Sequence, residues 1–238
     1  MRFLGDVVEW FTTAEHWRGT AGIPHRLYEH VVMSLAATLT AAIVALTVGI
    51  VLGHLNRGGW LAINLSNVGR AIPSFAILVL AVQLFGIGAT PAFCALVALA
   101  VPPMVTNAYV GVREVDPDIR ESARGMGMTG AQVLRRVELP VASPLIMAGI
   151  RTSAVQVVAT ATLAALVAWG GLGRYVIDGL NQRDYVQVFA GAVLVAVLSV
   201  LTELVLAGVQ RLLVPAGLRG RDSGKNELFV ATAPAVGG

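Results

Sequence analysis

Long runs without Asp, Glu, Lys or Arg dominate this chain of 238 residues. The first run lies between Glu29 and Arg57, and the second holds 42 uncharged residues between Arg70 and Arg113. A membrane-spanning helix needs about 20 mostly apolar residues, and a charge near the bilayer centre costs about 2.5–3.5 kcal/mol. The first run therefore predicts one transmembrane helix, and the second is long enough for two.

Glycine and proline interrupt the second run in the sequence FGIGATP at residues 85–91, which predicts a tight turn between two spans. A third uncharged run separates Arg151 from Arg174, and a fourth apolar stretch near the C-terminus contains Glu203 as its one acid. The pattern predicts an all-α integral membrane protein. We expect about five transmembrane helices, near residues 31–53, 71–84, 92–112, 144–169 and 188–214.

The composition supports this interpretation and excludes several others. Of all residues, 56% are hydrophobic and 13% are charged, and the mean hydropathy is +0.74. Soluble proteins average about 45–50% apolar and about 25% charged residues, so this chain has too little polar surface to cover a water-soluble globule. The single cysteine excludes a disulfide framework, and a net charge of +3 is too small to follow a nucleic-acid duplex.

The distribution of Lys and Arg predicts the orientation in the membrane, because cytoplasmic loops carry an excess of these residues. If the C-terminus is cytoplasmic, that side holds twelve of the 17 basic residues and the other side holds five. We therefore expect the N-terminus outside and the C-terminus in the cytoplasm. Together, the expected spans and this orientation divide the chain into three segments. They are a periplasmic or interfacial segment at 1–30, a transmembrane domain at 31–214 and a disordered cytoplasmic tail at 215–238.

The first thirty residues do not form a secretory signal peptide, because they contain Asp6, Glu9 and Glu15 and lack an apolar core. Apolar side chains recur there at helical spacing, which is typical of an amphipathic helix lying on a membrane surface. These are Phe3, Leu4, Val7, Val8, Trp10 and Phe11. A disordered leader is the alternative.

The loop at residues 113–140 is the most highly charged part of the chain, with five arginines and five acids in its first 26 residues. Asp116 followed by Pro117 is typical of a helix N-terminus, with an acid at the cap and proline in the first turn. Four small residues would let another protein approach the backbone of this helix closely: Ser122, Ala123, Gly125 and Gly127. A loop that only joined two spans could be much shorter. A solvated helical hairpin is the alternative interpretation.

Glu121-Ser122-Ala123, then Gly127, and then Val137-x-Leu139-Pro140 resemble the EAA motif of ABC importer permeases. That motif reads E-A-A, three residues, G, nine residues, I-x-L-P, and every spacing fits. In that family the first helix of the motif is the coupling helix, which docks into a groove on the cytoplasmic ATPase. The resemblance implies that ATPase coupling is carried by Glu121, Ser122, Ala123, Arg124, Gly125, Gly127, Val137, Leu139 and Pro140.

Other short strings resemble the osmoprotectant branch of these permeases, which imports glycine betaine, choline, carnitine or proline. Among them are residues 70–75 (RAIPSF), 123–129 (ARGMGMT), 160–165 (TATLAA) and 170–173 (GGLG). The resemblance implies a bacterial inner-membrane subunit with the type I ABC importer permease fold. The implied partners are a pair of ATPase subunits, a second identical or homologous permease, an extracytoplasmic substrate-binding protein and the lipid bilayer.

The chain itself lacks the features of an enzyme. It contains no G-x-x-x-x-G-K-[ST] loop, so the resemblance implies that the partner ATPase binds ATP and Mg²⁺ and that this chain holds no cofactor. All four histidines lie outside the expected spans, which argues against a metal site within the membrane. Two alternatives remain: an ABC permease for another polar solute such as an amino acid, and a secondary transporter or channel, which would need intramembrane ionisable residues or inverted repeats.

Five polar side chains within the expected spans are candidates for lining a translocation path: Asn107, Gln156, Thr160, Thr162 and Glu203. Such side chains also bond across helices, at about 0.6–2 kcal/mol each, so helix packing is the alternative for every one of them. For Glu203 we favour pairing with a neighbouring helix. Arg151 is expected to begin the fourth span and to extend toward the membrane interface.

Two further features concern the ends of the spans. Gly49 and Gly53 are expected to allow close helix approach, and the glycines of residues 170–173 are expected to form a tight turn. Residues 172–184 lie on the side from which a binding protein would dock, with an ordinary interfacial loop as the alternative. The spans hold few aromatic residues for a cage around a quaternary ammonium, so we expect substrate selectivity to reside largely in the binding protein.

Overall fold

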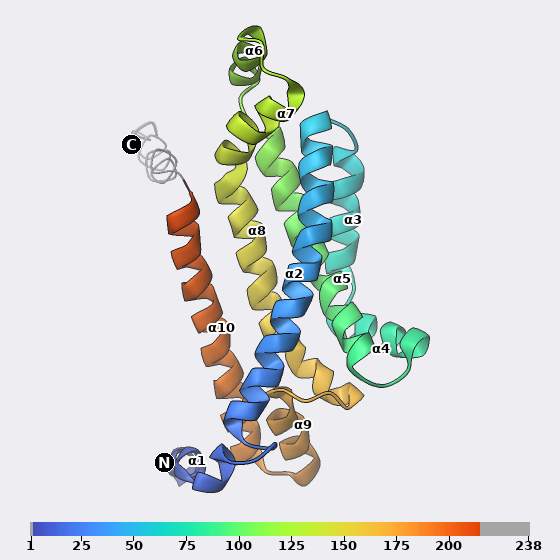
Figure 1. The fold of residues 1–238 in the computed structure, drawn as a ribbon. Coiled ribbons are helices and arrows are strands. Elements are labelled where there is room, and N and C mark those ends of the chain that lie inside the picture. The colour runs from blue at the N-terminus through green and yellow to red at the C-terminus, as the bar shows by residue number, and fades with distance from the viewer. Residues whose placement is uncertain (1, 215–238) are drawn as a thin grey trace, which may run out of the picture.

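The computed structural model describes residues 2–214, and every regular element in that range is helical. The expected tail at 215–238 lies outside the described residues. Long helices form one elongated bundle, and short helices lie at its two ends (Figure 1). In chain order the elements are α1 (Arg2–Thr12), η1 (Ala14–Trp17), α2 (Ile23–Leu55), α3 (Gly59–Ala71), α4 (Ser74–Phe85), α5 (Ala89–Arg113), α6 (Pro117–Gly125), α7 (Gly130–Val133), the π-helical turn η2 (Leu134–Glu138), α8 (Leu139–Thr160), η3 (Ala161–Val167), α9 (Gly173–Gln182) and α10 (Tyr185–Leu213).

Four helical stretches are long and apolar enough to cross a membrane: Ile23–Leu55, Ala89–Arg113, Gly130–Val167 and Tyr185–Leu213. A fifth passage results when α3 and α4 are counted as one span that bends by 90° between Ala62–Gly69 and Ser74–Phe85. The expectation of an all-α protein with about five spans is therefore confirmed.

The second expected span, at residues 71–84, is not one straight helix. Ile72 separates α3 from α4 in an extended conformation, with φ −76° and ψ 124°. Pro73 explains the break, because proline disfavours helical geometry at the preceding residue and has no N–H to donate. The 12 residues of α4 reach only about 18 Å, so this passage needs α3 as well to cross a core of about 30 Å.

The expected turn at residues 85–91 is present. Gly86 (φ 78°) and Gly88 (φ 144°) adopt backbone conformations that residues with a side chain rarely take. α5 begins directly afterwards at Ala89 and returns along the bundle.

Small residues on α2 let it pack closely against α5. Along one face of α2, every fourth residue is small and buried: Ala37, Ala41, Ala45, Gly49 and Gly53. A Cβ added to Gly49 would lie 2.7 Å from the carbonyl oxygen of Val105, and one added to Gly53 would lie 2.9 Å from the Cβ of Val112. Both distances are too short for real contacts, so the expected role of the two glycines in close helix approach is confirmed.

A cluster of buried apolar side chains lies at the end of the bundle that carries the N-terminus. It is formed by Trp10, Ile23, Leu172, Tyr175, Ala190 and Val195. α1 contributes Val7 and Trp10 to the buried surface and leaves Phe3, Leu4 and Val8 exposed. Residues 2–12 therefore form the amphipathic helix, and the disordered leader is excluded for them.

The fourth expected span differs in its limits from residues 144–169. α8 already begins at Leu139, and its regular helix ends at Thr160, where the 3₁₀ helix η3 continues to Val167. The glycine-rich segment after it contains the expected turn, since Gly171 has φ 81°. This turn leads into α9, which lies beside the start of α2 at the N-terminal end of the bundle.

Candidate functional site

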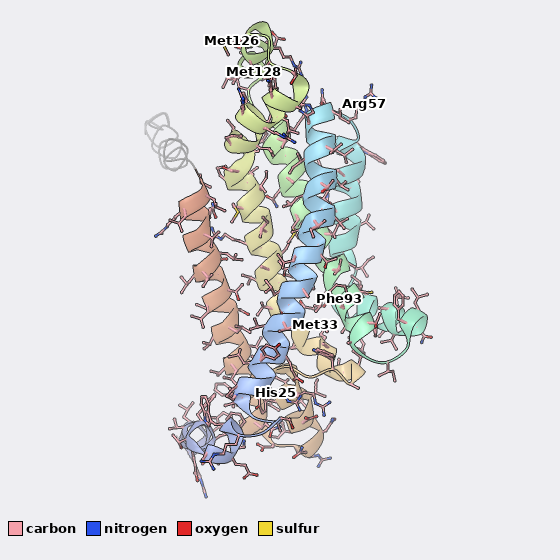
Figure 2. The ribbon with its side chains drawn as sticks, in the orientation of Figure 1. His25, Met33, Arg57, Phe93, Met126 and Met128 are labelled. Carbon is pink, nitrogen blue, oxygen red and sulfur yellow. The ribbon has the colours of Figure 1, made fainter. Side chains whose placement is uncertain are left out.

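The short helix α6 projects from the end of the bundle opposite to α1 and α9 (Figure 1). Its first turn is built as the sequence predicts: the Asp116 side chain accepts a hydrogen bond of 2.9 Å from the backbone N–H of Asp118, and Pro117 occupies the first helical position. Figure 2 shows Met126 and Met128 at this end and His25 at the other. The charged loop therefore places a capped helix at one tip of the molecule.

One side of α6 is open to solvent. Most residues of the motif's first half lie on it: Glu121, Ser122, Arg124, Gly125 and Gly127 are exposed. Met126, next to them, is 73% exposed. Ala123 is buried instead. We call the exposed residues from Glu121 to Gly127 the α6 surface.

Gly127 terminates α6 in a left-handed conformation with φ 83°. Its N–H donates to the carbonyl of Arg124, and the N–H of Met128 donates to the carbonyl of Ala123. These two bonds form a Schellman motif, in which the residue after the cap is usually glycine because it has no Cβ. The left-handed backbone conformation thus requires a glycine at this position of the motif. Its small size also allows a partner to approach closely.

A buried ion cluster fixes α6 to the bundle. Glu138, in the π-helical turn before α8, is fully buried, and its Oε1 lies 3.1 Å from Nε of Arg120 on α6. Its Oε2 accepts a hydrogen bond of 2.6 Å from Nδ1 of His54 at the end of α2. Arg120 also donates from Nη2 to the carbonyl of Val112 on α5. One carboxylate therefore joins α6, α2 and the start of α8.

The second half of the motif lies at this joint and not on the α6 surface. Val137, Leu139 and Pro140 are half-buried in the turn where the hairpin enters α8. Because Arg120 directly precedes Glu121 and Glu138 lies between Val137 and Leu139, the ion pair connects the two ends of the motif. Sequence reasoning missed His54, Arg120 and Glu138; the signal was their charge, next to the motif, in a chain with few charges.

The five candidate path residues lie on four elements. Asn107 on α5 donates to the carbonyl of Pro103, and its Cβ faces Gly149 of α8, where a Cβ would lie 2.8 Å away. Thr160 lines a small cavity between α4, α5 and η3. Thr162 on η3 donates to the carbonyl of Ala159. Asn107 therefore contributes to helix packing, and Thr162 has a local partner.

Gln156 and Glu203 are the remaining two candidates, and Glu203 pairs with Arg151. Gln156 is half-buried on α8. The guanidinium of Arg151 forms an ion pair with Glu203 and donates a hydrogen bond of 2.6 Å to Oε1 of Gln210. The expectation that Arg151 begins its span and extends to the interface is wrong, because α8 starts twelve residues earlier and the side chain turns to α10. The favoured pairing of Glu203 with a neighbouring helix is what the structure shows.

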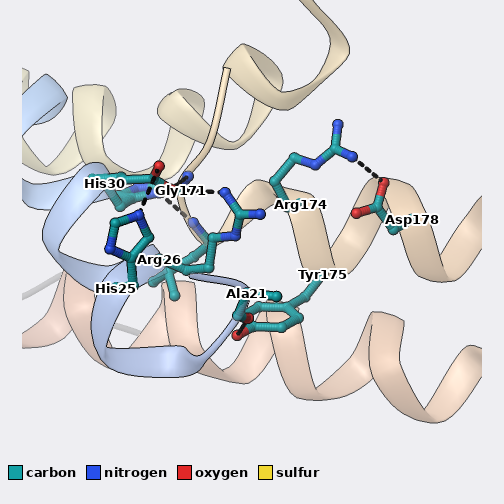
Figure 3. Close-up of polar contacts among 10 residues, drawn as sticks. Ala21, His25, Arg26, His30, Gly171, Arg174, Tyr175 and Asp178 are labelled. Atoms are coloured by element: carbon teal, nitrogen blue, oxygen red, sulfur yellow. Dashed lines mark hydrogen bonds and ion pairs between the residues drawn. The ribbon is translucent and has the colours of Figure 1, made fainter. Parts of the chain in front are cut away.

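Polar contacts hold the other end of the bundle together (Figure 3). Glu29 forms an ion pair with Arg26 and accepts a hydrogen bond of 2.8 Å from the N–H of Gly171. His30 is buried; its Nδ1 accepts from the N–H of Leu172, so Nε2 carries the proton and donates to the carbonyl of Val158. These bonds fasten the start of α2 to the turn between η3 and α9.

α9 covers most of residues 172–184 and is fixed in the same way. The Tyr175 hydroxyl donates a hydrogen bond of 2.6 Å to the carbonyl of Ala21, and burial raises the pKa of this phenol to about 12. Arg174 and Asp178 form an ion pair of 3.0 Å one turn apart. Residues 180–185 are exposed without a break. Within residues 2–214, no group of three or more His, Cys, Asp or Glu side chains could hold a metal ion.

Comparison with known proteins places these features in a family. Residues 30–216 match the family described as "Binding-protein-dependent transport system inner membrane component". The chain is 41% identical over 195 residues to the choline transport system permease protein OpuBB of Bacillus subtilis, covering 82% of this chain and 90% of the relative. It is 40% identical over 192 residues to the glycine betaine/carnitine/choline transport system permease protein OpuCB of the same organism, covering 81% and 88%.

The fold is similar to a solved transporter. A chain from an inward-facing structure of the MetNI methionine ABC transporter aligns with a TM-score of 0.68 at 22% identity, covering 79% of this chain and 94% of that one. At this identity the likeness concerns the fold alone.

Proposed function

Because the chain belongs to the family of binding-protein-dependent transport system inner membrane components, we propose that it is the permease subunit of an ATP-driven importer of osmoprotectants. The proposed solutes are glycine betaine, choline, carnitine or proline. Support comes from relatives at about 40% identity, whose names include choline, glycine betaine and carnitine transport. The chain covers at least 88% of each of these two relatives, so the similarity extends over most of their length.

The observation that carries the coupling role is the α6 surface. It is exposed at the tip of the molecule, and the Arg120–Glu138 ion pair joins its base to α8. We propose that α6 docks on a cytoplasmic ATPase, which binds ATP and Mg²⁺, and that two ATPase subunits work with two permease subunits and an external binding protein. Closure of the ATPase pair would move α6, and the ion cluster would pass this movement to α2 and α8.

The proposed orientation puts α6 in the cytoplasm and α1 and α9 outside. It rests on the twelve-to-five distribution of Lys and Arg. With Cys94 replaced by alanine, a cysteine at Met126 should react with an impermeant thiol reagent only from the cytoplasmic side. A cysteine at Asn181, exposed on α9, should react only from outside. Reaction of Met126→Cys solely from outside would contradict the orientation.

Purification and uptake test the proposed function together. The tagged chain is purified from its native membranes in mild detergent, and uptake of radiolabelled choline, glycine betaine, carnitine, proline and methionine is measured in cells with and without its gene. We expect an ATPase to co-purify and gene-dependent uptake of at least one of the first four solutes. Absence of the ATPase would contradict the importer, and uptake of methionine alone would point to an amino-acid permease instead.

A further inference from the structure

The uncovered faces of the long helices differ in chemistry. α10 exposes large apolar side chains, with Val197, Val200 and Leu204 between 52% and 62% exposed. The uncovered face of α8 is more polar and carries smaller residues: Thr152 and Ala159 are exposed, and Gln156 is half-buried beside one apolar residue, Val155. Residues spaced by three, four and seven positions share one face of a helix, so these four side chains form a single surface. We call it the α8 polar face.

A charged pair borders this face at membrane depth. Arg151 lies about 18 Å from the start of α8, and Glu203 lies about 15 Å from the end of α10, at a rise of 1.5 Å per residue. Their side chains are nevertheless 28% and 40% exposed. Ionised side chains at such depth face protein or water and not lipid. Glu203 meets this requirement by facing Arg151, and the exposed part of its carboxylate is suited to water and not to lipid.

The other side of the α8–α10 contact has the opposite character. An apolar groove runs there between α2, α8 and α10, lined among others by Leu35, Leu39, Ile150, Leu198 and Leu206. Glu203 lies outside this groove, about 100° around α10 from Thr202, which lines it. The contact between α8 and α10 thus separates a surface suited to lipid from a surface suited to water.

We infer that the α8 polar face lines the aqueous path through the assembled transporter, and that the carboxylate of Glu203 is a transient contact for the ammonium group of the solute. This inference rests on the proposed function. Choline, glycine betaine and carnitine share a quaternary ammonium, which donates no hydrogen bond and is attracted by negative charge and by the faces of aromatic rings.

Arg151 gives this contact a suitable strength. Its guanidinium is shared between Glu203 and Gln210, so the carboxylate is partly neutralised before the solute arrives. A site on a conduction path must attract the solute and must also release it. An unpaired carboxylate at this depth would hold a cation too firmly, whereas a carboxylate paired with Arg151 can exchange one partner for the other.

Cysteine accessibility tests the path. In a Cys94→Ala background, the assembled transporter in membranes is treated with an impermeant thiol reagent that reacts only in water. We expect Thr152→Cys to react at least tenfold faster than Leu39→Cys, the control in the apolar groove, where Leu39 is 54% exposed. Equal rates, or faster reaction at Leu39→Cys, would overturn the assignment of the α8 polar face.

Protection by the solute tests the carboxylate contact. Millimolar choline should slow the reaction of Thr152→Cys, and this protection should be lost when Glu203→Gln is added. Glu203→Asp keeps the charge and should retain part of the protection. A purely structural ion pair would lower the amount of folded protein without removing protection, so protection that survives in Glu203→Gln would overturn the contact.

The two proposals fail in different ways. If the parental assembly imports none of the osmoprotectants, the proposed function is wrong, and the ammonium contact falls with it. The contrast in labelling between Thr152→Cys and Leu39→Cys still decides whether α8 lines an aqueous path. If uptake is present but protection is absent in the parental background, the proposed function stands and the contact at Glu203 is wrong.

Discussion

Gly125 and Gly127 are two residues apart on the α6 surface, and the structure distinguishes them. Gly125 is the last helical residue, and a Cβ there would meet nothing within 4 Å. Gly127 has as much space but a φ of 83°. From the sequence both are small residues that allow close docking, and the backbone angle of Gly127 is visible only in the structure.

We expect Gly127→Ala to weaken the end of α6 by about 1–2 kcal/mol, because the left-handed conformation brings Cβ close to the next carbonyl. Gly125→Ala should strengthen the helix by about 0.5–1 kcal/mol, since alanine is the better helix former. Hydrogen exchange of the α6 amides in lipid nanodiscs measures both effects. Slower exchange in Gly127→Ala than in the parent would contradict the Schellman cap.

The Arg120–Glu138 pair makes a second prediction for single residues. Glu138→Gln leaves the buried charge of Arg120 without its partner and should destabilise the protein by about 3–5 kcal/mol. Replacing both residues by methionine removes both charges and should cost much less than the sum of the single changes. Thermal unfolding in detergent gives the comparison, with the exposed Glu114→Gln in the same loop as the control. Additive losses would show that the two side chains do not interact.

At the scale of the helices, the contact between α2 and α5 depends on the absence of side chains at two glycines. Gly49 and Gly53 face the backbone and side chains of α5 at distances that leave no room for a methyl group. Gly208 on α10 offers a contrast, because a Cβ there would meet nothing within 4 Å. All three are glycines inside long apolar helices, but only Gly49 and Gly53 lie four residues apart, the spacing that predicted their close approach from the sequence.

Gly49→Ala should therefore destabilise the bundle by about 1–3 kcal/mol, the usual range for overpacking a tight contact. Gly208→Ala should leave stability unchanged or raise it slightly, since alanine favours the helix. Melting temperatures of the two purified variants, measured in the same detergent, decide the question. Equal melting temperatures would mean that α2 and α5 tolerate a wider separation than the structure shows.

For the whole molecule, the spacing of charged residues was enough to predict the number of transmembrane spans. A charge-free run as long as a span is compatible with few folds other than a transmembrane helix. The bend at Ile72-Pro73 was missed because the spans were placed by the runs without charges, although the proline is a visible signal. The spacing of the EAA motif identified the segment that forms α6. The cluster of His54, Arg120 and Glu138 could not be predicted, because it joins residues 84 positions apart whose contact depends on how α2 and α8 pack.

The central claim is that the α6 surface transmits the work of an ATPase to the spans. Gly125→Asp tests it better than the same change at Gly127, where strain would be added to charge. An unpaired carboxylate buried at a protein contact costs several kcal/mol. Gly5→Asp, at an exposed position of α1 at the other end of the bundle, is the matched control, since a Cβ there also meets nothing within 4 Å.

The most direct measurement follows membrane abundance, ATPase co-purification and uptake of labelled choline, glycine betaine and carnitine in the same cells. We expect Gly125→Asp to reach the membrane at the parental level and to lose both the bound ATPase and the uptake, while Gly5→Asp keeps all three. If Gly125→Asp retains its ATPase and imports solute at the parental rate, the α6 surface is not where the ATPase acts.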